Sequence, residues 1–198
     1  MANVDRANGF RPVKSQLGAP WTSLVRHYPA TTGRNGTNNS GDIYIGDIVE
    51  ISGGYAQPMT TLGGAVLGVV VAVGKDNSET ALNTDNAKRY YDPDNLSKRY
   101  LAYDEAGYVG VVPAEGCLFQ VQSDATGMAQ GSLADLGIAT TAARGNRTTG
   151  NSLQFITTAA TGNDVEIVEM VDSPDNDPSE VNGKYIVKFT SVRHSIDT

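Results

Sequence analysis

The apolar residues of this chain are concentrated in short β-branched runs, and this pattern favours strands over helices. The strongest run, residues 65–73, is almost continuous and bounded by glycines, which predicts a strand buried on both faces. Residues 43–45 and 48–51 flank Gly46 and Asp47, where we expect a tight turn or a bulge. Further strands are predicted over residues 100–103, 107–113, 117–122, 153–158, 165–171 and 184–192.

Several short strands about ten residues apart predict an all-β fold, either a compact β-barrel or a β-sandwich. Only residues 132–137 resemble a helix, in the form of one short capped turn. Residues 75–99 form a long polar connection that contains Tyr90 and Tyr91, and loops of this length are usually functional. We therefore expect a single β-rich body over residues 42–198, with a loop at 75–99 whose tyrosines contribute to a contact surface.

The N-terminal segment differs from the rest of the chain in charge. Residues 1–34 hold five cations and one acid, a net charge of +4, whereas the remaining residues hold ten cations and twenty-one acids, a net charge of −11. The segment contains the only tryptophan, Trp21, shows no sustained apolar periodicity, and continues into a stretch rich in Gly, Asn and Thr. These features predict an extended basic arm and linker over residues 1–41.

The predicted arm carries aromatic and arginine side chains, which are the types that most often anchor protein interfaces. Its positive charge favours an acidic partner surface. Trp21 has two interpretations, since it either contacts a partner or packs on the body of its own chain. Together with the loop tyrosines, the candidate interface residues are Arg6, Phe10, Arg11, Trp21, Arg26, Tyr28, Tyr90 and Tyr91.

The sequence contains no recognisable catalytic motif. Gly68 and Gly74 are separated by five residues and Lys75 is followed by Asp76, so this stretch does not fit a phosphate-binding loop. Neither histidine lies in a nucleophile motif, and no Gly-x-Ser-x-Gly sequence occurs. We therefore predict neither an enzyme nor a cofactor site.

Metal and thiol chemistry are also disfavoured. Two histidines, His27 and His194, and one cysteine, Cys117, are too few for a typical zinc site. Cys117 begins an apolar run, which predicts a buried thiol that acts as a small hydrophobe. The acidic stretches 92–95 and 172–177 lack the pattern of a twelve-residue calcium loop, so we expect turns there and no metal.

Nucleic acids and membranes are not expected partners. The acidic charge of the body opposes phosphate binding, and the cations of the arm are widely spaced. No apolar stretch approaches the ~18 residues of a membrane span. The N-terminus lacks the apolar core of a secretory signal, so we expect synthesis in the cytoplasm.

Several segments of the sequence carry a resemblance to a known family of proteins. They are residues 1–13, 18–21, 46–49, 68–70, 171–176 and the strand that begins near Tyr185. In these segments the chain resembles the small head-decoration, or cement, proteins of tailed bacteriophages. The resemblance is spread over the full length and includes no catalytic motif.

This resemblance implies a structural protein on the outer surface of a phage capsid, made in the host cytoplasm and carried on the virion. Its partner would be the major capsid protein, whose neighbouring subunits it would bridge and stabilise. Proteins of this kind are β-rich homo-oligomers, with a trimer favoured here and a dimer as the alternative. They have no active-site residues to transfer, and an extended arm commonly reaches over adjacent subunits.

Two other functions remain open from the sequence. The first is another virion component, such as a head-fibre base or a tail protein. The second is a β-barrel module that binds a glycan or a nucleic acid.

Overall fold

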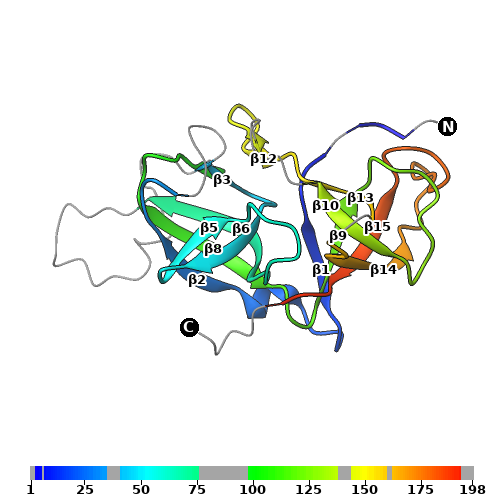
Figure 1. The fold of residues 1–198 in the computed structure, drawn as a ribbon, viewed down its shortest axis with the longest axis horizontal. Coiled ribbons are helices and arrows are strands. Elements are labelled where there is room, and N and C mark those ends of the chain that lie inside the picture. The colour runs from blue at the N-terminus through cyan, green and yellow to red at the C-terminus, as the bar shows by residue number, and fades with distance from the viewer. Residues whose placement is uncertain are drawn as a thin grey trace.

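The computed structural model describes residues 3–5, 7–34, 41–75, 98–137, 144–159 and 162–192. These residues form nearly all-β structure, as the sequence predicts, with two larger and two small antiparallel sheets. The described part contains a single 3-10 turn, η1 (Trp21–Leu24). The two larger sheets lie side by side, the six-stranded sheet on the right of Figure 1 and the five-stranded sheet on the left.

The six-stranded sheet curls into a small barrel. From one edge to the other its strands are β1 (Arg11–Ser15), β9 (Cys117–Gln122), β15 (Lys184–Phe189), β14 (Val165–Met170), β10 (Leu133–Gly137) and β13 (Phe155–Thr158). Just after β9, Ser123 forms a bridge with Ile156 on β13, and the Asp124 amide donates to the Ile156 carbonyl at 3.1 Å. This contact brings the last strand of the sheet back to the second and encloses the apolar side chains between them.

The five-stranded sheet is also curled, because its two edge strands contact each other. In order, its strands are β2 (Arg26–Ala30), β8 (Gly107–Pro113), β6 (Gly68–Lys75), β4 (Ile48–Ser52) and β5 (Tyr55–Pro58). The edge strands are β2 and β5. Two short pairs complete the fold, β3 (Ile43–Tyr44) with β7 (Tyr100–Leu101) and β11 (Gly145–Asn146) with β12 (Asn151–Ser152).

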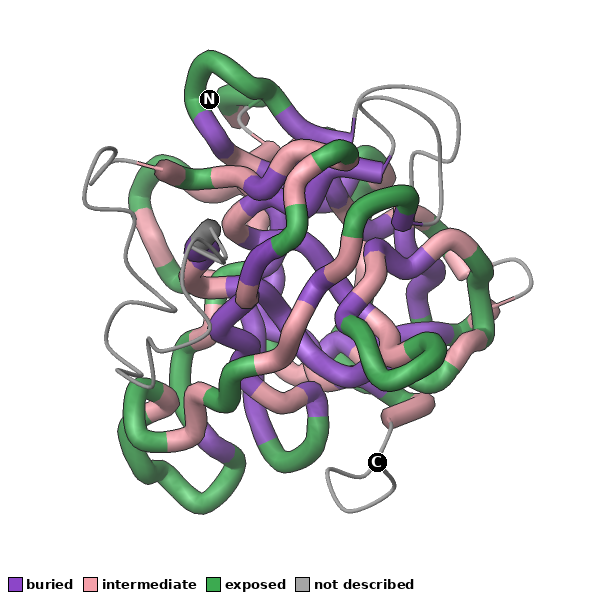
Figure 2. Tube along the Cα trace, turned by 90° about the vertical axis from the view of Figure 1, so that its left-hand side faces the viewer, coloured by how far each residue is buried: buried purple, intermediate pink, exposed green. Residues whose placement is uncertain are grey.

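The central strands of the five-stranded sheet separate two apolar cores. Val69 on β6 and Val112 on β8 belong to the core that includes the barrel interior, whereas Val70 and Val111 belong to a second core on the opposite face. The two-sided burial predicted from the continuous apolar run is therefore confirmed. Figure 2 shows buried stretches running through the middle of the molecule, with exposed stretches mainly at its periphery.

The N-terminal segment is extended, as predicted, but it is built into both sheets. Strand β1 pairs with β9, from Arg11 opposite Gln120 to Ser15 opposite Cys117. Strand β2 pairs with β8, and η1 lies between β1 and β2 in the chain. This corrects the expectation of an arm that stands apart from the body. Both strands lie at sheet edges and contain a proline and exposed cations, which protect edges from pairing with further strands. The same residue types make the sequence of this segment resemble that of a linker.

Phe10 joins the N-terminal segment to the barrel core. Its side chain is 1% exposed, and its ring centroid lies 5.4 Å from that of Phe189, which packs edge-on against Phe119. The Phe10 amide donates to the Gly46 carbonyl at 2.9 Å, and the Gly46 amide donates to the Val70 carbonyl at 2.8 Å. A continuous path of contacts therefore runs from Phe10 through the turn before β4 to strand β6.

The approach of the two backbones at this point requires glycine. Gly9 has a φ of 66°, and a Cβ added to it would lie 2.4 Å from the Gly46 carbonyl oxygen and 2.5 Å from the Ser152 Cβ. Gly46 has a φ of 93° and lies against the Asn8 carbonyl in the same way. A side chain at either position would separate the N-terminal segment from the turn.

The helical turn predicted over residues 132–137 is wrong, because this segment is strand β10. Ala134 pairs with Thr158 on one side and with Val165 on the other. Pairing with two neighbouring strands and burial of Leu136 in the barrel outweigh the local capping signal of Ser132.

Most of the predicted loop at 75–99 lies outside the described residues. In the described part of the chain, no helix is long and apolar enough to cross a membrane.

Asp47 is a fully buried carboxyl group in the turn between β3 and β4. Its Oδ2 accepts a hydrogen bond from the Tyr44 amide at 2.8 Å, while its Oδ1 has no partner among the described residues. Burial raises the pKa of Asp47 to about 7, although the nearby Arg144 acts in the opposite direction. The folded state therefore binds a proton at Asp47 more tightly than the unfolded chain does.

We predict that substitution of Phe10 with Ala lowers the free energy of unfolding by about 3–5 kcal/mol, because it removes a buried aromatic ring. The measurement is equilibrium denaturation in urea. Leu17→Ala is the matched control, since Leu17 lies in the same segment but is 97% exposed, and it is expected to change stability by less than about 0.5 kcal/mol. Equal stability of Phe10→Ala and the wild type would contradict the structural role of the segment.

We also predict a pH dependence of stability that originates at Asp47. The contribution is complete below the unfolded-state pKa of about 3.9 and is lost as the pH rises through the folded-state pKa of about 7. The slope is at most ~1.4 kcal/mol per pH unit between these values. Asp47→Asn should flatten this part of the curve of unfolding free energy against pH. An unchanged curve in the variant would exclude Asp47 as the source.

Candidate functional site

The structure distributes the predicted contact residues over different parts of the molecule. Phe10 is buried in the core, which corrects its assignment to an interface, because its ring packs on Phe189. Arg11 on β1 and Arg26 at the start of β2 are exposed. Trp21 in η1 is half-buried against the core that includes the barrel interior, and Tyr28 on β2 is half-buried against the second core. Arg6, Tyr90 and Tyr91 lie outside the described residues.

The exposed part of the N-terminal segment is a ridge, residues 13–18, at the end of β1. Leu17 is 97% exposed and Val13 is 40% exposed, and Lys14 is exposed between them. The turn is held by the Ser15 side chain, whose Oγ accepts from the Ala19 amide at 2.9 Å. The Gln16 amide also donates to the Gly116 carbonyl at 2.7 Å, so the ridge presents Leu17 on an ordered backbone.

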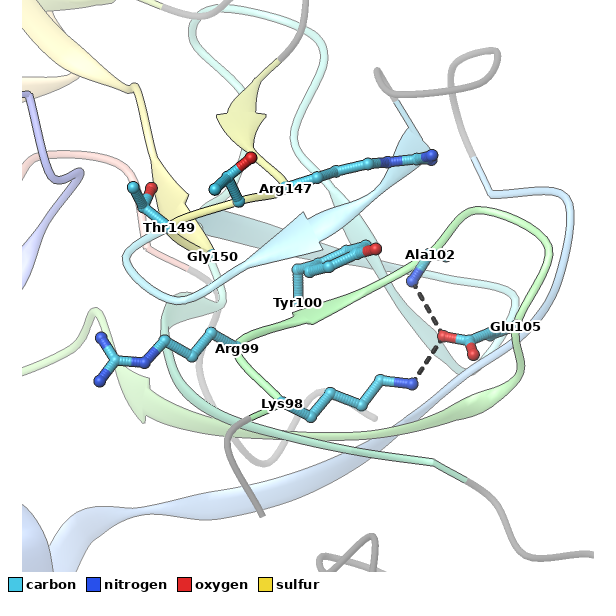
Figure 3. A pocket seen from close by; sticks show the side chains of 9 residues that line it. Lys98, Arg99, Tyr100, Ala102, Glu105, Arg147, Thr149 and Gly150 are labelled. Carbon is cyan, nitrogen blue, oxygen red and sulfur yellow. Dashed lines mark hydrogen bonds and ion pairs between the residues drawn. The ribbon is translucent and has the colours of Figure 1, made fainter. Parts of the chain in front are cut away.

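A polar pocket of about 570 Å³ lies beside β7. Three segments form its walls: the start of β7, the turn that follows β7, and the turn between β11 and β12. Figure 3 shows Lys98, Tyr100 and Arg147 extending in the same direction, while Arg99 extends the opposite way. The lining residues are Lys98, Arg99, Tyr100, Ala102, Glu105, Arg147, Thr148, Thr149 and Gly150.

Asp42 fixes the part of the pocket wall that Arg147 forms. Its carboxylate is buried and accepts two hydrogen bonds from Arg147, Nε at 2.7 Å and Nη2 at 3.0 Å. It also accepts from the Tyr44 hydroxyl and from the Tyr103 amide, each at 2.8 Å. Hydrogen bonding to Asp42 raises the pKa of Arg147 further above its ordinary value. A carboxylate with this many donors fixes the orientation of Arg147 over the pocket.

Arg34 is a buried cation that orders the turn after β7. Its guanidinium donates to backbone carbonyls, among them Glu105 at 2.7 Å and Leu101 at 3.2 Å. It also donates to the carbonyls of Thr31, Gly41 and Ala102. Burial lowers the pKa of Arg34 to about 10, so the side chain keeps its charge at neutral pH. The turn that carries Glu105 is therefore held in place by an internal guanidinium.

The Tyr100 ring lines the pocket and packs on a second, buried aromatic ring. Tyr100 stacks on Tyr44, with ring centroids 5.5 Å apart and an interplanar angle of 22°, and the Arg147 guanidinium lies 5.7 Å from the Tyr100 centroid. Gly145 allows the stack, because a Cβ there would lie 2.4 Å from the Tyr44 ring. Burial, followed by the hydrogen bond to Asp42, raises the pKa of Tyr44. The Tyr44 side chain is thus neutral at neutral pH.

A tight turn presents Arg147 and the two threonines. The Asn146 side-chain oxygen accepts from the Thr148 amide at 2.8 Å and from the Thr149 amide at 3.2 Å. Gly150 closes the turn with a φ of 69° and donates to the Asn146 carbonyl at 2.6 Å. The backbone of Thr148 and Thr149 is therefore held in place at the pocket.

Sequence reasoning missed this pocket. The Asn-Arg-Thr-Thr-Gly stretch that starts at Asn146 indicates a turn, but nothing local connects Arg147 to Asp42, which is 105 residues away. Lys98 and Glu105 form an ion pair at 2.7 Å. Lys98 lies at the end of the long connection and Glu105 in the turn after β7, and neither position suggests a binding site from the sequence. The pairing of β3 with β7 brings Asp42 to the segment that carries Lys98 and Glu105, and the bonds of Arg147 to Asp42 add the turn between β11 and β12.

The acidic stretch at 172–177 forms turns, as predicted. Asp175 pairs with Lys184 at 2.9 Å, and Asp177 accepts from the Ser179 hydroxyl at 2.6 Å. Cys117 is buried, also as predicted, and burial raises the pKa of its thiol. Within the described ranges, no cluster of three or more His, Cys, Asp or Glu side chains could ligate a metal ion.

Comparisons of the chain with protein-family models, with curated proteins and with solved structures find no match.

We predict that Asp42→Ala destabilises the fold by about 1–3 kcal/mol, because it leaves the buried Tyr44 hydroxyl and the Tyr103 amide without their common acceptor. Urea denaturation measures the effect. Asp175→Ala removes an exposed ion pair of similar length, and its denaturation midpoint is expected to match the wild type. Similar midpoints for the two variants would show that the Asp42 network does not hold the pocket.

Proposed function

We propose that this chain is a structural virion protein that decorates the outer surface of a phage capsid and stabilises it by bridging major capsid subunits. The observation that carries the proposal is the ordered, exposed ridge at residues 13–18 on a segment that contributes an edge strand to each sheet. The sequence resemblance to head-decoration proteins supports the same function.

The ridge has the chemistry of a docking surface. Leu17 offers an apolar side chain that is almost wholly exposed, and Lys14, on the same ridge, supplies an exposed cation. Burial of a leucine side chain contributes about 1.5–3 kcal/mol of binding free energy, and a neighbouring cation favours an acidic partner surface. An acidic face of a capsid subunit is the partner that this combination fits.

The placement of the edge strands supports bridging. Strand β1 belongs to the barrel and β2 to the five-stranded sheet, and both come from one short stretch of chain. A partner that binds along β1 and β2 contacts both larger sheets. A force on that contact is therefore resisted by the apolar cores of both sheets.

The proposal includes self-association on the capsid, with a trimer favoured and a dimer as the alternative. It places the protein on the outside of the virion and involves neither nucleic acid nor membrane. The residues of the capsid subunit that meet Leu17 are acidic or apolar in this account.

We predict that the double variant Lys14→Glu and Leu17→Asp loses about tenfold or more of its affinity for undecorated capsids of the encoding phage, because both contacts become repulsive or hydrated. Sedimentation of capsids with labelled protein measures the occupancy. Leu133→Asp is the matched control, since Leu133 is 42% exposed on β10, outside the ridge, and should bind as the wild type does.

Two outcomes would contradict different parts of the proposal. Full occupancy by the ridge variant would exclude the ridge as the docking surface. Failure of the wild-type protein to bind capsids at all would overturn the decoration function itself.

A further inference from the structure

The polar pocket beside β7 contains hydrogen-bond donors and hydrogen-bond acceptors that are not used within the described residues. Glu105 Oε2 accepts from Lys98 at 2.7 Å and from the Ala102 amide at 3.3 Å, whereas its Oε1 accepts no hydrogen bond from the described residues. Lys98 uses one of its three donors in this pair, and Arg147 binds Asp42 through Nε and Nη2 only. A ligand that fills the pocket must therefore both donate and accept.

Hydroxyl groups add to this mixed character. The hydroxyls of Tyr100 and Thr148 have no hydrogen-bond partner among the described residues, and that of Thr149 makes only two long hydrogen bonds, to the Asn146 carbonyl and from the Asn151 amide, each at 3.5 Å. Each hydroxyl can donate one hydrogen bond and accept others. A molecule with several hydroxyl groups of its own is the complement of such a wall.

Other ligand classes fit less well. An apolar ligand would bury these polar groups without partners, at about 1–3 kcal/mol each. A small inorganic anion would meet Lys98 and Arg147 when each is already paired with a carboxylate, and it would also face Glu105. The volume of about 570 Å³ lies in the range of small-molecule sites and accommodates a short saccharide.

Arg99 gives one end of the pocket a distinct charge. It is exposed, points away from Lys98 and Arg147 in Figure 3, and has no carboxylate within ion-pair distance among the described residues. Its backbone is fixed against the closing turn, because Gly150 leaves no room for a Cβ beside the Arg99 Cβ. A planar guanidinium in this position matches a ligand carboxylate.

We propose that this pocket binds a short saccharide, with a carboxylate-bearing sugar unit at its Arg99 end. Lys98, Glu105 and Arg147 hydrogen-bond the sugar hydroxyls, and the Asp42 and Arg34 networks hold these side chains in place before the ligand arrives. This binding event is separate from capsid decoration, so either one can fail without the other.

Calorimetric titration of the full-length protein with a panel of neutral and uronic-acid trisaccharides, including galactotriose and trigalacturonate, tests the proposal. We expect saturable binding, with the acidic member of each pair bound more tightly. The double variant Lys98→Ala and Glu105→Ala should bind about tenfold or more weakly, because it loses a donor and an acceptor together. The matched control, Asp175→Ala with Lys184→Ala, removes an ion pair outside the pocket and should leave binding unchanged.

Arg99→Ala provides a second test at an exposed position, where the fold does not depend on the side chain. It should reduce the affinity for trigalacturonate to that for galactotriose. Absence of binding to every trisaccharide of the panel would overturn the proposal, as would wild-type affinity in the Lys98 and Glu105 double variant. Equal binding of the two probes by the wild type would overturn the role of Arg99.

Discussion

The close approach of Gly9 to Gly46 is the contact on which the rest of the structure depends. It allows the N-terminal segment to lie against the turn that precedes β4, and it places Phe10 in the barrel core next to Phe189. From this contact the segment continues as β1 along the barrel and then as β2 along the five-stranded sheet. One short stretch of chain thus connects the cores of both sheets.

This arrangement changes the meaning of the basic N-terminal charge. The cations do not belong to a free tether but to two edge strands, where charge prevents unwanted pairing of the exposed backbone. The part that stays available to a partner is small, the ridge around Leu17, and it is displayed on an ordered turn. A docking surface of this kind loses little conformational entropy on binding, whereas a free arm would have to be ordered at that moment. Removal of the whole segment would damage the fold, so point substitutions on the ridge are the informative experiment.

The sequence predicted the β-class of the fold and several strands, because β-branched runs carry a strong local signal. The limits expected for 107–113 and 117–122 coincide with β8 and β9. It did not predict β1 and β2, whose pairing partners lie about eighty residues or more further along the chain and whose own composition is that of a linker. It mistook β10 for a helical turn for a related reason, since pairing on both sides is not visible in five residues. The pocket was beyond local reasoning altogether, because Asp42 and Arg147 meet only after the sheets form.

The most direct measurement is amide hydrogen exchange of the native protein over residues 11–15 and 26–30. If the N-terminal segment is built into both sheets, the amides that point toward β9 and β8 will exchange slowly and only through opening of those sheets, while the Leu17 amide exchanges faster. Rapid exchange of every amide in both stretches, at the rate of an unstructured chain, would contradict this arrangement and favour an N-terminal arm that does not pair with the sheets.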